Sequence, residues 1–217
     1  MQKIQTPLFR GIGDDALEQM RQCGGIRQKQ FGKGDIIFRI GETVHELGIV
    51  LSGSVNIENI DLWGNKSILS HISVGQVFAE TYACCAEPMM VDAVADEETQ
   101  VLFLDLDRLL LTPHPEFDWQ QTLNNNLLRI SLRKNLALSE RIFCTSPKTI
   151  RGRLLLYLSN QSARAGSRTF TIPFNRQALA DYLNLDRSAL SKELGKMRNE
   201  HLLLVDKNTF TLLDGVE

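Results

Sequence analysis

The sequence predicts an α+β protein with three successive parts: an all-β domain, a long helix, and a small helical domain that ends in two strands. Three observations support this prediction. Short apolar runs alternate with glycine-containing turns over residues 26–105, residues 116–143 keep a helical period, and residues 175–213 contain two short helices and a hairpin. We place the domain boundaries at 1–115, 116–144 and 145–217.

The composition is typical of a water-soluble globular protein, because 43% of the 217 residues are hydrophobic and 23% are charged. No apolar run approaches the roughly 18 residues needed to cross a bilayer. The N-terminus also lacks the apolar core of a signal peptide. We therefore expect a cytoplasmic protein that has no membrane partner.

The first part begins with a predicted helix that starts at Asp14 or Asp15 and stops at Gly24 and Gly25. Beyond it, glycines recur about every ten residues, a spacing typical of a sandwich of short strands. They are Gly32, Gly34, Gly41, Gly53, Gly64 and Gly75. We expect a jelly-roll-like β-roll here, followed by a short helix around Leu106–Leu111.

The predicted long helix follows a break at Pro113-His114-Pro115 and carries two apolar stripes. The first stripe is Leu123, Leu127, Ile130 and Ala137, and the second is Leu128, Leu132, Leu136 and Phe143. A helix that is apolar on two sides must be buried on two sides, most simply against its own β-roll and against a second copy of the chain. We assign the first stripe to a dimer interface. A helix buried entirely within one subunit is the alternative.

The stretch Cys144–Pro147 interrupts the helical pattern and is predicted to be a hinge. Ser146 is the expected cap and Pro147 the expected first residue of a helix that ends near Ser159. The polar residues 160–167 predict a surface loop, and residues 169–173 a short strand.

The C-terminal part predicts a winged helix-turn-helix. Asn175 can cap a first helix, Asn184 can end it in a left-handed conformation, and Asp186 can cap a second helix that begins at Arg187. Leu190, Leu194 and Met197 of the second helix share an inward stripe, whereas a separate polar side carries Arg187, Ser188, Ser191 and Lys192. Residues 202–206 and 209–213 predict two strands that form the wing. An ordinary pair of capped amphipathic helices is the alternative interpretation.

The stretch NRQALADYLNLDRSALSKEL closely resembles the winged helix-turn-helix of the CRP/FNR superfamily of bacterial transcription regulators. The stretches KGDIIFRIGE, LGIVLSGSV and GQVFAE resemble the β-roll of that family, and the long helix falls where the family has its dimerisation helix. The resemblance implies a sequence-specific DNA-binding regulator. Its implied partners are double-stranded DNA, a second copy of the chain and RNA polymerase.

The resemblance also implies roles for individual residues. It assigns Arg187, Ser188 and Lys192 to base contacts. We expect Ser191 to assist them, and Arg176 and Gln177, at the start of the first helix, are candidates for phosphate contacts. The charge distribution agrees, because residues 145–217 carry 11 basic and 7 acidic side chains, whereas residues 1–144 carry 13 and 19.

The stretch GQVFAE resembles the start of the cassette that binds the cyclic phosphate in nucleotide-sensing members, with two departures. Ala79 replaces the usual glycine, and the Arg-Ser pair that grips the phosphate falls on Met89 and Met90. We therefore expect no response to cyclic AMP. The expected effector pocket suits a hydrophobic or aromatic effector, or none, and comprises Phe78, Glu80, Tyr82, Cys84, Cys85, Met89 and Met90. An alternative function is a cyclic-nucleotide-binding-like module that regulates a protein partner.

The sequence contains no constellation typical of an enzyme or of a metal site. The four histidines are scattered, without metal-ligand spacing. Cys23 stands alone in the region where oxygen-sensing members of the family hold an iron–sulfur cluster with several cysteines. We interpret Cys84 and Cys85 as small buried hydrophobic residues, and a redox or metal role for this pair stays open. No cofactor is identified.

Overall fold

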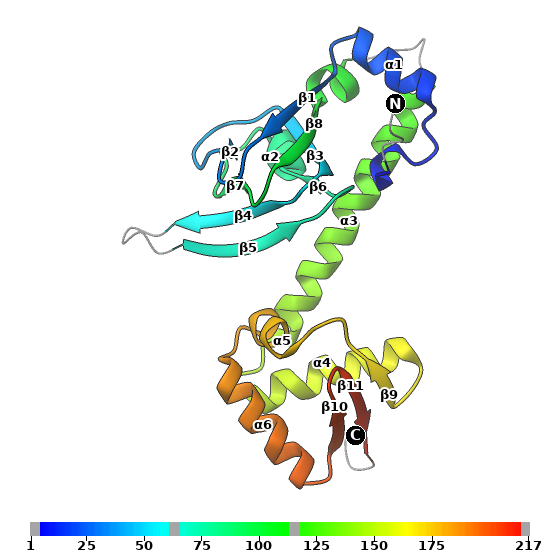
Figure 1. Ribbon diagram of the computed structural model, residues 1–217. Helices are drawn as coiled ribbons and strands as arrows, with labels where there is room; N and C mark the ends of the chain where they lie inside the picture. Colours follow the sequence, from blue (N-terminus) through cyan, green and yellow to red (C-terminus); the bar gives the residue numbers. More distant parts are fainter. Residues whose placement is uncertain (1–4, 61–65, 113–117, 214–217) are drawn as a thin grey trace. The chain divides into compact units, whose positions relative to one another are not determined.

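The structure is a computed structural model that describes residues 5–60, 66–112 and 118–213 (Figure 1). The chain divides into two compact units, residues 1–133 and 134–217. The predicted turn at Gly64, the break at residues 113–115 and the predicted helix start at Glu116 lie outside the described residues. No helix among those described is both long enough and apolar enough to cross a membrane.

The first unit starts with a short turn of helix, η1 (Pro7–Phe9), and α1 (Asp14–Gln22). As predicted, α1 begins at Asp14 and buries Leu17 and Met20, and the chain then turns at Gly24, whose φ is +69°. Eight strands follow: β1 (Ile26–Phe31), β2 (Ile36–Phe38), β3 (Glu46–Ser52), β4 (Val55–Ile60), β5 (Lys66–Ile72), β6 (Val77–Phe78), β7 (Asp92–Ala95) and β8 (Thr99–Asp105). Two short helices accompany them, α2 (Glu80–Cys85) and η2 (Asp107–Leu111).

The strands form two four-stranded antiparallel sheets, in the orders β1-β8-β3-β6 and β2-β7-β4-β5, which confirms the predicted β-roll (Figure 1). Aromatic rings fill the core. The ring centroid of Phe38 lies 5.9 Å from that of Phe78 and 5.6 Å from that of Phe103. Gly48 makes this packing possible, because a Cβ atom at that position would lie 2.3 Å from the Phe78 ring.

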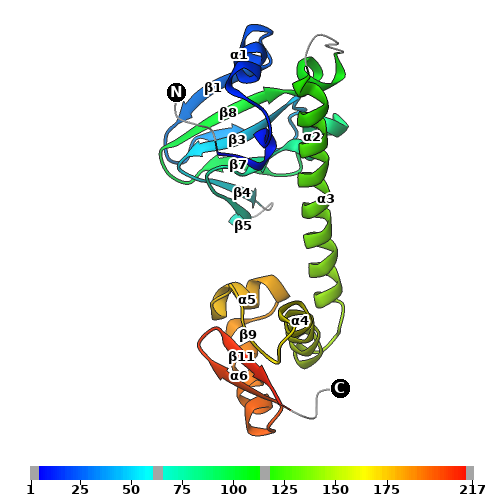
Figure 2. The same cartoon turned by 90° about the vertical axis from the view of Figure 1, so that its right-hand side faces the viewer.

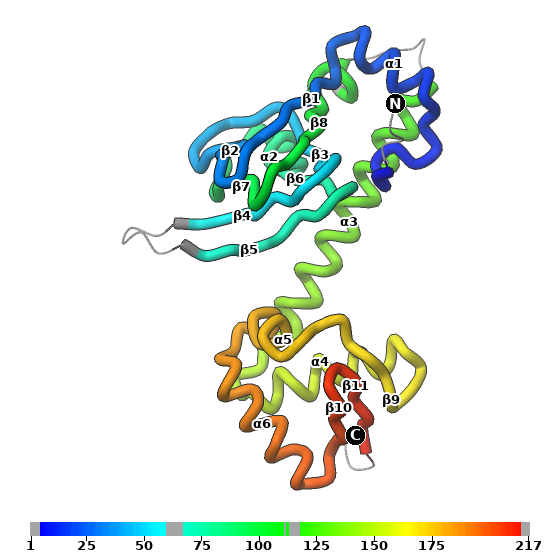
Figure 3. Tube along the Cα trace, viewed as in Figure 1, coloured from blue at the N-terminus to red at the C-terminus, as the bar shows by residue number. Residues whose placement is uncertain are grey.

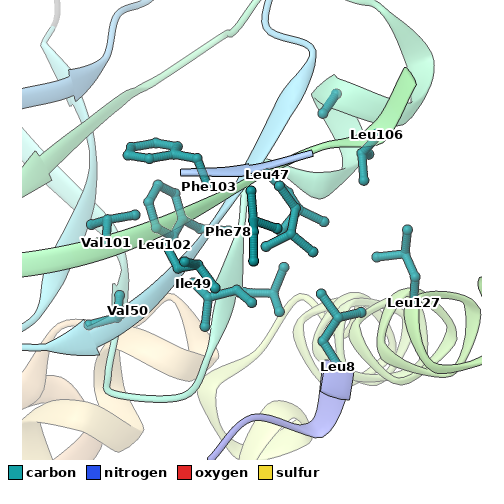
Figure 4. Packing of buried hydrophobic residues seen from close by; sticks show 14 of the residues in the cluster. Leu8, Leu47, Ile49, Val50, Phe78, Val101, Leu102, Phe103, Leu106 and Leu127 are labelled. Atoms are coloured by element: carbon teal, nitrogen blue, oxygen red, sulfur yellow. The ribbon is translucent and has the colours of Figure 1, made fainter. Parts of the chain in front are cut away.

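The long helix α3 (Trp119–Thr145) contributes to both units. Near its start, Trp119, Leu123 and Leu127 are buried in the core of the first unit, and Figure 4 shows Leu127 beside Leu8. At its end, Cys144 is buried in the core of the second unit. The boundary between the compact units therefore falls within α3.

The burial of α3 corrects the assignment of its two apolar stripes. Leu123 and Leu127 are 1% and 5% exposed because they pack on their own unit, so they are not available to a second subunit. Ile130 is half-buried against the same core, and Ala137 is exposed. The second stripe faces solvent instead: Leu128, Leu132, Leu136 and Phe143 are between 55% and 69% exposed.

The second unit continues with α4 (Ile150–Ala165), whose two ends differ from the prediction. The cap is Thr149, not Ser146, because the Thr149 hydroxyl accepts a hydrogen bond from the Gly152 amide at 3.0 Å. Residues 160–165 continue the helix instead of forming a loop. Good helix formers such as Ala163 and Arg164 extend it as far as Gly166, which ends it with φ +60°.

The remaining elements form the predicted winged helix-turn-helix (Figures 2 and 3). They are β9 (Thr169–Thr171), α5 (Arg176–Leu183), α6 (Arg187–Asn199), β10 (Leu203–Asp206) and β11 (Thr209–Leu212). The three strands pair antiparallel in the order β10-β11-β9. Under this sheet, the rings of Phe170 and Phe210 stack with centroids 6.3 Å apart.

Candidate nucleic-acid interface and effector region

Side-chain caps set the two ends of the turn between α5 and α6, as the sequence predicts. The Asn175 side chain accepts a hydrogen bond from the Ala178 amide at 2.9 Å and thereby starts α5. Asn184 ends α5 with φ +53°. These two local signals fix where the first helix begins and where the chain turns towards the second.

Asp186 caps α6 through one carboxylate oxygen. Its Oδ1 atom accepts hydrogen bonds from the Ser188 hydroxyl at 2.5 Å and from the Ala189 amide at 2.8 Å. These two bonds, that of Ser188 first, lower the pKa of Asp186 below its ordinary value. The cap therefore stays ionised at neutral pH, and the Ser188 hydroxyl proton is directed to it.

The side of α6 that carries its polar residues is exposed to solvent. Leu190, Leu194 and Met197 are buried in the core of the second unit. The four predicted base-contacting residues, Arg187, Ser188, Ser191 and Lys192, are all exposed. The structure thus brings these four side chains together on the solvent side of α6.

Arg151 of α4 holds the other side of α6, and sequence reasoning missed it. Its Nε atom donates to Glu193 Oε1 at 2.6 Å, and its two Nη atoms donate to the Glu200 carboxylate at 2.7 and 2.9 Å. These bonds raise the pKa of Arg151. The hydrogen bonds from Arg151 are also the main reason that the pKa of Glu200 is lowered. Because 42 and 49 residues separate the partners, no local pattern could have indicated this contact.

Two further arginines bind the backbone at the end of α5. Arg141, on α3, donates from Nε to the Tyr182 carbonyl at 3.0 Å and from Nη2 to the Asp181 carbonyl at 2.9 Å. Arg153 donates from Nη1 to the carbonyls of Leu183 and Asn184, both at 3.0 Å, and from Nε to that of Pro147 at 2.9 Å. The last carbonyls of a helix carry partial negative charge and lack helical partners, so two cations suit this place.

The residues predicted to bind phosphates have partners within the chain. The guanidinium of Arg176 lies 5.2 Å from the ring centroid of Phe210, and burial lowers its pKa. Its Nη1 atom is buried and has no acceptor among the described residues. Gln177 is exposed, and its Nε2 atom donates to Asp181 at 2.9 Å. Arg176, on α5, therefore contacts the wing through the ring of Phe210.

The residues predicted to form an effector pocket differ widely in burial. Phe78, Glu80 and Met89 are buried, Tyr82 is half-buried, and Cys84, Cys85 and Met90 are exposed. Met90 follows Met89 directly. Because Met89 points into the core, Met90 turns outwards and is 74% exposed. The interpretation of Cys84 and Cys85 as buried residues is also wrong.

The thiol of Cys84 is harder to ionise than an ordinary cysteine. Partial burial raises the pKa of Cys84, and the neighbouring Cys85 and Glu80 raise it further. The Cys23 thiol donates a hydrogen bond to the Met20 carbonyl. Within the three described stretches, no group of three or more metal-binding side chains lies close enough together to hold a metal ion.

Alanines in the left-handed conformation flank α2. Ala79 has φ +61° and Ala86 has φ +54°. Position 79 thus keeps the left-handed backbone conformation that glycine adopts without steric cost, although the residue here is alanine. The substitution noted in the sequence therefore changes the residue and leaves the left-handed turn in place.

We expect the substitution Ala79→Gly to stabilise the first unit by about 1 kcal/mol, because removing Cβ relieves left-handed strain that exceeds the added entropy of the unfolded chain. Thermal unfolding of the full chain should show a midpoint raised by about 2–4 °C. Ala83→Gly is the matched control. Ala83 is a buried residue of α2, so its replacement should lower the midpoint. A lower midpoint for Ala79→Gly would contradict the argument.

Together, the β-roll, the long helix and the winged helix-turn-helix define a β-sheet domain joined by a helix to a DNA-binding domain. Residues 28–111 match the cyclic nucleotide-binding domain family, and residues 152–215 match the Crp-like helix-turn-helix domain family. This chain belongs to the CRP/FNR superfamily and is a DNA-binding transcription regulator.

Comparisons with characterised proteins agree with this assignment. Electron transport regulator A of Shewanella oneidensis is 24% identical over 208 residues, which cover 87% of this chain and 79% of the relative. Transcriptional activator protein FnrA of Stutzerimonas stutzeri is 24% identical over 223 residues, with coverage of 97% and 85%.

Two solved structures share the fold. The OCPA complex of CprK has a TM-score of 0.63 at 17% identity and covers 90% of this chain and 91% of CprK. The catabolite activator protein of Thermus thermophilus has a TM-score of 0.50 at 21% identity, with coverage of 96% and 94%.

Proposed function

We propose that this regulator binds a near-palindromic operator as a homodimer, reads bases with the exposed side of α6, and responds to a signal other than cyclic AMP. The exposed side of α6 is the observation that carries the proposal. Arg187 and Lys192 are free of ion pairs within 4.0 Å among the described residues, and they stand at the N-terminal end of a capped helix. Helix-turn-helix proteins present this part of the second helix to base edges in the major groove.

The arginine is suited to base recognition by its shape. Its planar guanidinium can donate two hydrogen bonds to O6 and N7 of guanine. The exposed Lys192 supplies a second cation for bases or phosphates. Two copies of α6 would read two half-sites about 34 Å apart. Acting on transcription from such a site, the dimer would contact RNA polymerase.

The second stripe of α3 supports the homodimer. Its four members are more than half exposed, and Ile142, about 40° from Leu128 around the helix, is 69% exposed. An exposed apolar surface of this kind on one helix favours an interface with a second copy of the same helix. The interface in this proposal therefore consists of Leu128, Leu132, Leu136 and Phe143, in place of the stripe assigned from the sequence.

The effector region supports independence from cyclic AMP. A cyclic phosphate is an anion, and its transfer from water into a β-roll requires a cation or several donors. The seven predicted pocket residues include one carboxylate, Glu80, and no basic side chain. The positions that correspond to the Arg-Ser pair hold a buried Met89 and an exposed Met90. Loss of the arginine contact corresponds to roughly 3–5 kcal/mol, or at least a hundredfold in affinity.

Titration calorimetry with cyclic AMP and cyclic GMP tests this part of the proposal. We expect no binding at micromolar nucleotide. The positive control is the CRP-like cAMP-activated global transcriptional regulator of Mycobacterium tuberculosis, a 22% identical relative. Micromolar binding to this protein would contradict the proposal, and its loss in a variant of Glu80 would show that the nucleotide occupies the predicted effector region.

A further inference from the structure

A half-buried glycine lies beside the predicted DNA-facing residues of α6. Gly195 lies in the interior of this helix, between Arg187 and Asn199. Glycine in a helix interior lowers stability relative to alanine, because it loses more backbone freedom on folding. Its presence in the helix that reads DNA therefore needs a reason.

The protein itself supplies no such reason. A Cβ atom at Gly195 would meet no other atom within 4 Å, and its φ is not positive. Other glycines of the chain differ in this respect. A Cβ at Gly48 would lie 2.3 Å from the Phe78 ring, and Gly53 has φ +76°. Only at Gly195 among these three would alanine be accommodated without strain.

The position of Gly195 relates it to the DNA-facing residues. Gly195 stands four residues after Ser191 and three after Lys192, and such residues are neighbours on a helix surface. Around the helix it lies about 140° from Leu190 and about 100° from Leu194, which are buried. The exposed Lys196 follows directly. Gly195 therefore prolongs the polar side of α6 beyond its first turn and has cations next to it.

We propose that Gly195 is a positioning residue of the DNA interface, which leaves room for a sugar-phosphate strand of the operator to approach the backbone of α6. A helix that enters the major groove with its N-terminal end towards the bases meets the wall of the groove with its later turns. A side chain at position 195 would hold that wall away and withdraw Arg187 and Lys192 from the bases. This inference rests on the proposed DNA-facing side of α6.

The test measures both stability and operator affinity of the Gly195→Ala protein. The inference predicts that its stability rises and that its affinity for the operator falls. In the full-length protein, Gly195→Ala should raise the midpoint of thermal unfolding by about 2–4 °C. An operator is first selected from a random duplex pool with the unmodified protein. Fluorescence anisotropy at fixed salt should then show that Gly195→Ala binds this operator at least tenfold more weakly than the unmodified protein. Gly195→Leu should bind more weakly still, because the larger side chain needs more space.

Gly13→Ala is the matched control. A Cβ at Gly13 also meets nothing within 4 Å, and this residue lies in the first unit. The control should bind the operator as tightly as the unmodified protein. A Gly195→Ala protein with a raised midpoint and unchanged affinity would overturn the inference, and so would a lowered midpoint, because the space would then not be free.

The variant Arg187→Ala, measured in parallel, separates this inference from the proposed function. If Arg187→Ala loses affinity and Gly195→Ala does not, only the role of Gly195 is overturned. If neither variant loses affinity, or if the unmodified protein enriches no sequence from the pool, the assignment of this side of α6 to DNA falls, and the role of Gly195 falls with it.

Discussion

Replacement of Leu136 by glutamate is expected to convert the protein from a dimer into a monomer. Leu136 is 69% exposed within one subunit, so a charge there leaves the fold of the subunit unchanged. In the proposed interface, the same carboxylate would be buried against apolar side chains without a partner, which costs several kcal/mol. Sedimentation should show monomers, and operator affinity should fall sharply because two half-sites can no longer be bound together.

The neighbouring Ala137 provides the matched control. It is exposed, belongs to the stripe first assigned to the interface, and points about 100° away from Leu136 around the helix. Ala137→Glu should therefore stay dimeric. If Ala137→Glu dissociates and Leu136→Glu does not, the exposed stripe is not the interface and the original assignment is restored for that part of the helix.

Replacement of Arg187 by alanine should weaken operator binding by about 1–3 kcal/mol and relax base preference at one position of each half-site. The cause is the loss of two parallel hydrogen bonds to a guanine, which a methyl group cannot replace. Binding to a selected operator measures the affinity, and a new selection with the variant measures the preference.

Arg187→Lys distinguishes base recognition from general attraction to DNA. Lysine keeps the charge but lacks the planar fork of the guanidinium. We expect this variant to keep the salt dependence of binding and to lose most of the base preference. If Arg187→Lys retains the preference and Arg187→Ala loses only affinity, Arg187 contacts phosphate and not a base.

The parts of the fold that local signals determine could be predicted from the sequence. Asn175, Asn184 and Asp186 each act within a few residues of their own position, and the structure places all three caps as expected. The two stripes of α3 were also recognisable. Which stripe covers the β-roll could not be decided, because helical periodicity gives the angle between stripes but not the direction of the neighbouring core.

Two further differences arise from tertiary structure. The inward direction of Met89 and the outward direction of Met90 depend on how their segment lies against the core, so the predicted pocket included residues that diverge. The arginines that hold α5 and α6 reach partners 30 or more residues away. Contacts of this kind arise from tertiary structure and have no local sequence pattern.

The contacts of Arg141 and Arg153 have a consequence for the evolution of such regulators. Both guanidinium groups bind main-chain carbonyls at the end of α5, and these acceptors are present whichever side chains α5 carries. Mutations in α5 or on the exposed side of α6 can therefore change operator preference without breaking the contacts that α3 and α4 make with the end of α5. A lineage could acquire new target genes while it keeps an inherited response to its signal.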